Sequence, residues 1–364
     1  MGEGGEMMAA CGVPKKIYLD QSFWSDVYNA QESSQGKSYD RVKRIFLLLQ
    51  KLKSINKVRI VVSDIHVRET SAFPEAYSEK RKAVWDLQNW VADGKIADNW
   101  GDVFIAQHRR LLGSHNNGSY PIEDLGLTEI KQPQARVRII MANKWRLRHF
   151  RQCSPTTDAF NSDARKIIEN QARNIPQCKS ADDCLNYIRG LWHDNIEQGI
   201  STRLETLDIM WRFEQDGELP SVEQMKAFNE HSGQSQIVSS VTRDMNEVVM
   251  LNKWSELLES DSVGPCPSLR IRTAFEAEIL FTWCQEKKRN PKKFGDYFGL
   301  SRQNDIDHVA TFVPYVDALT TDNPMRNLCK RKIVAEELSA FKCEVYSTQN
   351  YDEFENWLTE LLAK

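Results

Sequence analysis

Six acidic residues stand where strands are expected to give way to helices, and carboxylates in such positions could hold a metal ion. Asp20 ends a short apolar run at residues 16–20, and Glu69 lies in the first turns of a helix expected after residues 58–63. The other four lie near the C-terminus, at an expected helix start and around an expected strand: Asp305, Asp307, Asp317 and Asp322. Ligands of open parallel sheets bind at the carboxyl ends of the strands, so we expect these side chains to converge.

Clustered carboxylates of this kind favour a hard divalent cation. Like charges repel one another, and in a partly dry site one or more of the acids would take up a proton. A divalent cation removes that cost, and oxygen ligands without histidine or cysteine favour Mg²⁺ or Mn²⁺. Such ions hold a phosphodiester, lower the pKa of a bound water and stabilise the leaving oxygen. The acids therefore indicate metal-dependent hydrolysis of phosphodiester bonds.

Basic residues beside the acids are candidates for binding phosphate groups. We expect Arg302 and a basic run just before it to position a nucleic acid; the run contains Lys287, Lys288, Arg289, Lys292 and Lys293. A second basic strip at residues 131–157 has two open interpretations, a surface that tracks phosphates or a solvated helix face. The net charge of −3 predicts no attraction of nucleic acid by the whole molecule, so local patches must provide it.

The elements that must position these residues differ along the chain. Strands are expected at both ends, at residues 16–20, 58–63, 315–322 and 341–347, with amphipathic helices between them. In the middle, helical patterns dominate, at residues 75–91, 139–151, 158–174, 181–215, 221–231, 238–258 and 271–288, and one short strand is a candidate near 103–106.

Strands that alternate with helices predict an α/β fold with a parallel sheet flanked by helices. Because these strands occur at both ends of the chain, we expect one discontinuous domain formed by residues 14–74 and 295–364. A large all-α insertion, residues 75–294, is expected to interrupt it and to confer specificity or regulation. Deleting roughly residues 80–290 should then leave a folded but less selective domain.

Composition predicts a soluble cytoplasmic protein. Hydrophobic residues make up 41% and charged residues 27% of the chain, which is ordinary for a globular protein. The eight cysteines form no C-x-x-C pair and have no zinc-finger spacing, so we expect buried free thiols in a reducing compartment. Residues 1–13 lack the features of a signal peptide, and no stretch approaches the ~18 apolar residues of a membrane span. The oligomeric state stays open.

Three segments resemble the PIN-domain nucleases, which include the toxin ribonucleases of toxin–antitoxin modules. Residues 17–22 (Ile-Tyr-Leu-Asp-Gln-Ser) resemble the first strand of that family, with its Asp followed two residues later by Ser, Thr or Asn. Residues 61–69 (Val-Val-Ser-Asp-Ile-His-Val-Arg-Glu) resemble the second strand and the helix that bears the Glu. Residues 304–308 (Asn-Asp-Ile-Asp-His) and 316–323 (Val-Asp-Ala-Leu-Thr-Thr-Asp-Asn) resemble the third and fourth acidic positions.

This resemblance implies a PIN-like fold and a division of roles among the residues. It gives Asp20, Glu69, Asp305 and Asp322 as the catalytic metal ligands. Asp307 competes with Asp305 and Asp317 is an added acid, and the polar supports are Ser22 and Thr320. The implied activity is Mg²⁺- or Mn²⁺-dependent hydrolysis of RNA, most readily single-stranded RNA. Two biological roles are compatible with this activity. One is a toxin or defence role, with a partner protein that inhibits the enzyme, and the other is a role in RNA processing.

Other functions remain open at this level. A catalytically degenerate PIN-like module that binds RNA or a protein is the main alternative, although no acid is obviously missing. A phosphatase of the haloacid dehalogenase type would need a second Asp where Ser22 stands. The spacing of Arg110 and His115 matches the R-x₄-H motif of helical HEPN ribonucleases, but His115 falls in a loop-forming segment. The choice between RNA and DNA, and between endo- and exonuclease action, is also open.

Overall fold

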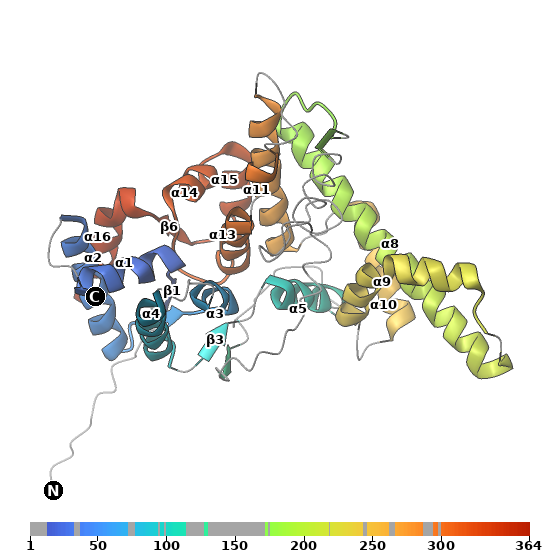
Figure 1. Ribbon diagram of the computed structural model, residues 1–364, viewed down its shortest axis with the longest axis horizontal. Coiled ribbons are helices and arrows are strands. Elements are labelled where there is room, and N and C mark those ends of the chain that lie inside the picture. The colour runs from blue at the N-terminus through green and yellow to red at the C-terminus, as the bar shows by residue number, and fades with distance from the viewer. Residues whose placement is uncertain are drawn as a thin grey trace, which may run out of the picture.

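A four-stranded parallel sheet lies among helices from both ends of the chain (Figure 1). The structure is a computed structural model that describes residues 13–32, 37–71, 77–93, 95–97, 100–113, 127–129, 172–173, 175–217, 219–242, 246–261, 266–286, 294–297 and 300–364. The strands are β1 (Lys15–Tyr18), β2 (Val58–Val61), β5 (Ala318–Thr320) and β6 (Glu344–Tyr346). Their order is β2-β1-β5-β6, and all neighbours are parallel. The predicted α/β class with a parallel sheet is confirmed.

The two central strands come from opposite ends of the chain. Ile17 of β1 pairs with Ala318 of β5, and Tyr18 pairs with Leu319. Since parallel strands end at the same edge of a sheet, the residues that follow β1, β2 and β5 meet at the carboxyl edge. The early and late acids are thereby brought to one side of the sheet.

Both faces of the sheet are covered by helices. Side chains of a strand alternate between the two faces. Ile17 and Leu19 accordingly lie in one hydrophobic core, whereas Tyr18 lies in the other. The first core is closed by an outer layer of helices, α1 (Gln21–Glu32), α2 (Lys37–Ser54), α4 (Ser78–Val91) and α16 (Tyr351–Ala363).

The second core is built around α11 (Pro267–Cys284), which is almost wholly buried. Its charged residues include Arg272, which is buried in ion pairs with Glu276 and Asp307. The helix packs on α8, α13 and α15. This core also takes residues from α13 (Leu300–Phe312), α14 (Asn323–Cys329) and α15 (Lys332–Leu338). The short helix α3 (Asp64–Ser71) contacts α1 and α4.

The long helix α8 (Ala181–Asp216) extends away from the sheet, and α9 (Val222–Thr242) and α10 (Glu247–Ser260) pack on it (Figure 1). Ser180 and Asp183 form a capping box at its start, and Gly217 ends it in the left-handed conformation with φ of 70°. Gly199 allows α8 and α9 to approach closely, since a Cβ there would lie 2.9 Å from Val238 Cγ2. The α5 helix (Trp100–Gly113) joins this group to the sheet-side helices.

Several sequence predictions differ from the structure. The candidate strand near residues 103–106 lies inside α5, because residues 100, 103, 104, 107 and 108 form a buried helical stripe. The break expected between 231 and 238 lies inside α9, where buried Gln234 and Ser235 continue the helix. Within the predicted insertion, α4 packs on α1 and α3 and belongs to the outer layer, so residue 75 does not mark a break in packing.

The remaining described elements are short. The strands β3 (Lys95–Ala97) and β4 (Leu127–Glu129) form an antiparallel pair, and α12 (Phe294–Tyr297) is a single turn. The helix expected at 139–151, the basic strip at 131–157 and His115 lie outside the described residues, as does the helix expected at 158–174 apart from residues 172–173. In the part of the chain that the structure describes, no helix combines the length and apolar character needed to cross a membrane.

Candidate functional site

Asp20 lies just beyond β1, where the chain enters α1. Its Oδ1 accepts a hydrogen bond from the backbone N–H of Phe23 at 3.2 Å, and Ser22 Oγ donates to its two oxygens at 3.0 and 2.8 Å. Thr320, at the end of β5, accepts from the backbone N–H of Asp20 at 3.0 Å and donates to Oδ1 at 3.3 Å. Burial raises the pKa of Asp20, although these hydrogen bonds oppose the rise. Both predicted supports, Ser22 and Thr320, therefore contact the carboxylate.

A buried histidine fixes the backbone immediately before Asp20. His66 Nε2 donates to the carbonyl oxygen of Leu19 at 2.6 Å, and Trp24 Nε1 donates to the same oxygen at 3.1 Å. His66 Nδ1 accepts from the backbone N–H of Ser63 at 3.0 Å. Burial lowers the pKa of His66 to about 3, so the ring is neutral, with one nitrogen donating and the other accepting. The turn from β1 into α1 is thereby held in place.

Glu69 projects from α3 and is held by two residues of α13. Asn304 Nδ2 donates to Glu69 Oε1 at 3.2 Å, and His308 Nε2 lies 3.6 Å from Oε2. The other ring nitrogen of His308 is hydrogen-bonded to the hydroxyl of Tyr18, which also lies 3.0 Å from Ser63 Oγ. Burial alone would raise the pKa of Glu69, but the interactions with His308, His66 and Asn304 together outweigh it and the pKa is lowered. Glu69 is therefore ionised at neutral pH.

Asp305 lies on α13 next to Asn304 and interacts with the other three acids. Burial and the charge of Asp322 raise the pKa of Asp305 to about 7, and the charges of Glu69 and Asp20 add to the rise. These like-charge effects indicate that the four carboxylates face a common region, although no three of them have oxygen atoms within 4.8 Å of one another. The contacts agree, because Asn304 binds Glu69 and Thr320 binds Asp20. We call Asp20, Glu69, Asp305 and Asp322 the acidic group.

Asp322 completes the acidic group at the start of α14. Its Oδ1 accepts from the backbone N–H of Met325 at 2.6 Å, so it is the N-cap of that helix. Asp20 plays the same capping role for α1. Capping is the ordinary structural use of an Asp in this position, and here it also fixes the direction of two carboxylates.

The acidic group offers the carboxylate oxygens that a hard divalent cation prefers, but its oxygen atoms are not gathered into one compact set. Among the described residues, no three of these acids bring oxygen atoms within 4.8 Å of one another. Asp20, Glu69, Asp305 and Asp322 are the residues that would hold such an ion, and Mg²⁺ commonly keeps several water ligands in proteins. Burial and the neighbouring like charges raise the pKa of Asp305, and a cation would offset the part of this cost that comes from like charge.

Two predicted metal ligands lie elsewhere, and the sequence interpretation is corrected for both. Asp307 is buried and ion-paired with Arg272 of α11. Two helical positions correspond to about 200° of rotation, so Asp307 and Asp305 leave α13 in different directions. Asp317 is ion-paired with Lys15 at 2.7 Å, at the amino edge of the sheet. Neither side chain belongs to the acidic group.

A cavity of about 450 Å³ is lined by residues that are sequence neighbours of two of the acids. Arg302 lies three residues before Asp305, and Pro324 lies two residues after Asp322. Among the described residues Arg302 has no hydrogen-bonding or ion-paired partner. Arg331 on the same wall lies 3.5 Å from Glu278. The full lining is Ile279, Thr282, Glu286, Tyr297, Arg302, Pro324, Asn327, Leu328 and Arg331.

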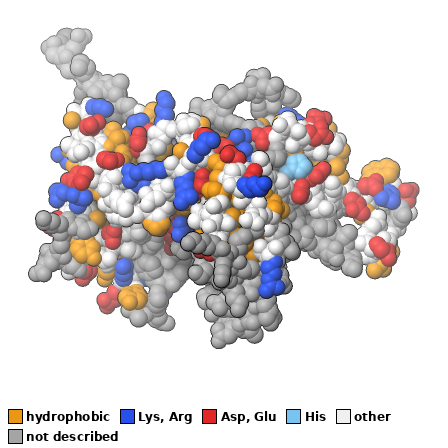
Figure 2. Space-filling model, turned by 90° about the horizontal axis from the view of Figure 1, so that it is seen from above, with side chains coloured by type: hydrophobic (Ala, Val, Ile, Leu, Met, Phe, Trp, Pro, Cys, Tyr) orange, Lys and Arg blue, Asp and Glu red, His pale blue; other side chains and the backbone are white. Residues whose placement is uncertain are grey.

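The other predicted phosphate-binding residues, Lys287, Lys288, Arg289, Lys292 and Lys293, lie outside the described residues. On the face shown in Figure 2, Lys and Arg side chains are interspersed with Asp and Glu. This mixture agrees with the small net charge of −3. Any attraction of a polyanion to this face must therefore be local.

Sequence reasoning missed the residues that hold the acidic group. Asn304 and His308 both contact Glu69, and their separation of four residues places them on one face of α13. That spacing was the sequence signal that could have identified them as neighbours on one side of the helix. Asp26 of α1 is another neighbour, because burial and the charge of Asp20 raise its pKa. His66 acts through the backbone of Leu19, a contact that sequence spacing does not indicate.

Comparisons with protein-family models, with curated proteins and with solved structures give no match for this chain. The resemblance to PIN-domain nucleases therefore rests on the quoted segments alone. The activity that it implies stays a prediction, which the arrangement of the acidic group allows us to formulate in molecular terms.

Proposed function

We propose that this protein is a Mg²⁺- or Mn²⁺-dependent nuclease with a PIN-like fold that hydrolyses single-stranded RNA. The observation that carries the proposal is the meeting of acids from both ends of the chain at the carboxyl edge of the sheet. Asp20 is hydrogen-bonded to Thr320 of β5, and Glu69 is hydrogen-bonded to Asn304 of α13. Open parallel sheets bind their ligands at this edge. The preference for RNA comes from the family resemblance.

In this proposal each residue of the site has a definite task. Asp20 and Asp322 present carboxylates whose directions are fixed by helix capping and, for Asp20, by Thr320. His308 keeps Glu69 ionised and oriented. When bound, the cation would lower the pKa of a water molecule and stabilise the leaving oxygen.

Arg302 is the candidate for positioning the substrate. It lines the cavity, lies three residues before Asp305 on α13, and has no partner among the described residues. Arginine binds phosphate through its planar fork of donors. We place the phosphate that precedes or follows the scissile bond there, so that Arg302 binds the backbone of the nucleic acid without reading its sequence. The biological role, toxin, defence or RNA processing, follows from the substrate and stays a part of the proposal.

The test is cleavage by the purified full-length chain of labelled single-stranded RNA and DNA, in Mn²⁺, Mg²⁺ or EDTA. Asp20→Asn keeps a residue that can cap α1 but removes the charge. We expect a loss of roughly 100-fold or more, because a catalytic cation contributes several kcal/mol and about 1.4 kcal/mol is tenfold in rate. Glu69→Gln should behave in the same way.

Asp317→Asn is the matched control, because Asp317 lies at the opposite edge of the sheet and is partly exposed beside Lys15. It should retain full activity. Cleavage that survives both EDTA and Asp20→Asn would reject the mechanism. Binding of RNA without cleavage under any of these conditions would instead support a catalytically inactive binding module.

A further inference from the structure

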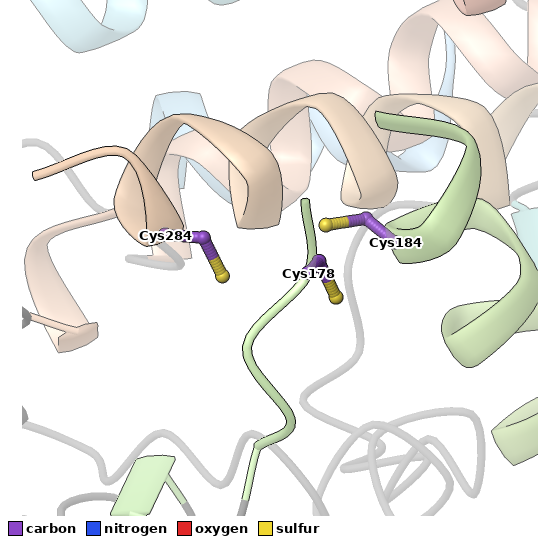
Figure 3. Close-up of side chains that lie close together, drawn as sticks. All are labelled: Cys178, Cys184 and Cys284. Atoms are coloured by element: carbon purple, nitrogen blue, oxygen red, sulfur yellow. The ribbon is translucent and has the colours of Figure 1, made fainter. Parts of the chain in front are cut away.

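Three cysteines from separate segments meet where α8 begins and α11 ends (Figure 3). Cys178 lies in the chain leading into α8, Cys184 lies one turn into that helix, and Cys284 is the last residue of α11. Their sulfur atoms all lie within 4.8 Å of one another. Their exposures are 6%, 0% and 7%, so the cluster is buried but can be reached at its margin. The sequence predicts only isolated thiols.

The cluster has the size and chemistry of a thiolate metal site. Zn²⁺ binds thiolate sulfur at about 2.3 Å, and a tetrahedron of that size places sulfur atoms roughly 3.8 Å apart. Sulfur atoms that already lie within 4.8 Å of one another need only small movements to reach that distance. Soft sulfur ligands select Zn²⁺ or Cu(I) over hard cations such as Mg²⁺. This site and the acidic group would therefore take different metals.

The helix ends around the cluster favour the same chemistry. Contact with Cys284 and burial raise the pKa of the Cys184 thiol in the metal-free protein, and the partial positive charge at the N-terminus of α8 opposes this rise. Cys284 ends α11, where the partial negative charge favours a cation. Both effects fall off within about one turn, which is the distance involved here.

A single buried thiol in this protein is accommodated differently. Cys266 is fully buried, and its Sγ lies 2.8 Å from Gln107 Oε1, to which it donates. An isolated free cysteine behaves as a small hydrophobic residue and needs no companion thiol. Three sulfur atoms gathered from a loop and two helices are more than such packing requires.

We propose that Cys178, Cys184 and Cys284 bind a d¹⁰ cation, Zn²⁺ or Cu(I), as thiolates. Binding releases the three thiol protons to solvent, and solvent takes the remaining position of a four-coordinate zinc ion. The ion ties the first turn of α8 and the loop before it to the end of α11. This inference is independent of the nuclease proposal, since none of the three cysteines belongs to the acidic group.

Metal analysis of the full-length chain, purified under reducing conditions without chelator, tests the site. We expect about one zinc or copper ion per chain, and the elemental analysis tells the two apart. Co²⁺ added to the metal-free protein should give thiolate-to-metal absorption that saturates at one equivalent. Removing the metal with a chelator should expose three further cysteines to maleimide, counted by mass spectrometry on the unsubstituted protein.

Cysteine variants assign the ion to the cluster. Cys178→Ser, Cys184→Ser and Cys284→Ser should each abolish the bound metal, whereas Cys343→Ser, outside the cluster and partly exposed, should retain it. The proposal is overturned if the chain holds no zinc or copper and gives no cobalt–thiolate absorption. It is equally overturned if two of the three cysteines form a disulfide in the purified protein, or if all three variants keep the metal.

Discussion

Replacing Asp305 by asparagine is expected to stabilise the metal-free protein while abolishing the metal-dependent activity proposed above. Asp305 is largely buried beside the charges of Asp322, Glu69 and Asp20, and its pKa is raised to about 7. Above this pH the fold holds a negative charge that its surroundings disfavour. Asparagine has nearly the same shape and never ionises, so it removes the repulsion without creating a cavity.

The magnitude follows from the linkage between protonation and folding. The pKa of Asp305 is raised from 3.8 to about 7. Between these values the folded protein keeps a proton that the unfolded chain has lost, so wild-type stability falls as the pH rises and becomes level above about pH 7. Each pKa unit corresponds to about 1.4 kcal/mol, which gives an upper limit of about 4 kcal/mol for the cost at pH 8.

Urea unfolding of the wild type and Asp305→Asn measures this cost. In EDTA, the advantage of the variant should grow from near zero at pH 4 to a plateau above pH 7. Repeating the series in Mg²⁺ should raise the stability of the wild type only, by about 2.7 kcal/mol when the ion is present at 100 times its Kd. The metal should thereby reduce the difference between the two proteins.

Asp307→Asn is the control, because it makes the same chemical change two residues away on α13. Asp307 is buried against Arg272, and loss of one partner of a buried ion pair costs about 3–5 kcal/mol. This variant should therefore be destabilised at pH 8, opposite in sign to Asp305→Asn. The reasoning is refuted if Asp305→Asn is also destabilised at pH 8, or if its effect does not vary between pH 4 and 7.

Three further predictions concern stability and use urea unfolding. Burial lowers the pKa of His108 to about 4, so the free energy of unfolding decreases as the pH falls from 6.5 to 4. His108→Gln should remove about 3 kcal/mol of that decrease. The same decrease in the variant and the wild type would contradict this. Gly199→Ala should cost about 1–3 kcal/mol through its clash with Val238, and no loss would mean that α8 and α9 separate readily. Arg272→Met should cost at least about 3 kcal/mol at pH 7, whereas replacing the exposed Arg212 should change little.

The sheet could be predicted because its strands carry strong local signals. Ile17, Tyr18 and Leu19 are all apolar, as a strand buried on both faces requires, and each is fully buried in the structure. The α8 helix was predicted to within one residue at its C-terminal end because its capping Ser180 and terminal Gly217 are local features. Such signals do not depend on distant parts of the chain.

The membership of the acidic group depends on three-dimensional direction, which spacing gives only in part. Asp305 and Asp307 were nearly equivalent in sequence. In the structure, Asn304, the neighbour of Asp305, contacts Glu69, whereas Asp307 is ion-paired with Arg272 of α11. Asp317 and Asp322 flank the same strand, and β5 carries the chain roughly 10 Å from one edge of the sheet to the other between them. Acids at the two ends of one strand cannot share an ion.

The cysteine cluster and the course of α9 depend on contacts between distant residues. Cys284 joins Cys178 and Cys184 only because α11 packs against α8. The polar run inside α9 has the composition of a loop, but the residues at 234 and 235 are buried in the packing with α8 and α5 and stay helical. Neither outcome leaves a local signal in the sequence.

The helical part of the chain is better understood as a support of the acidic group than as a detachable insertion. On α13, Asn304 faces Glu69 while Asp307 is bound to Arg272 of α11. The same α11 is tied to α15 by the ion pair of Arg270 with Glu337 at 3.0 Å. Deleting residues 80–290 would leave Asp307 buried without its cation and would expose the core face of α13. We therefore expect such a truncation to lose its fold, because the position of Asp305 depends on a helix that α11 holds in place.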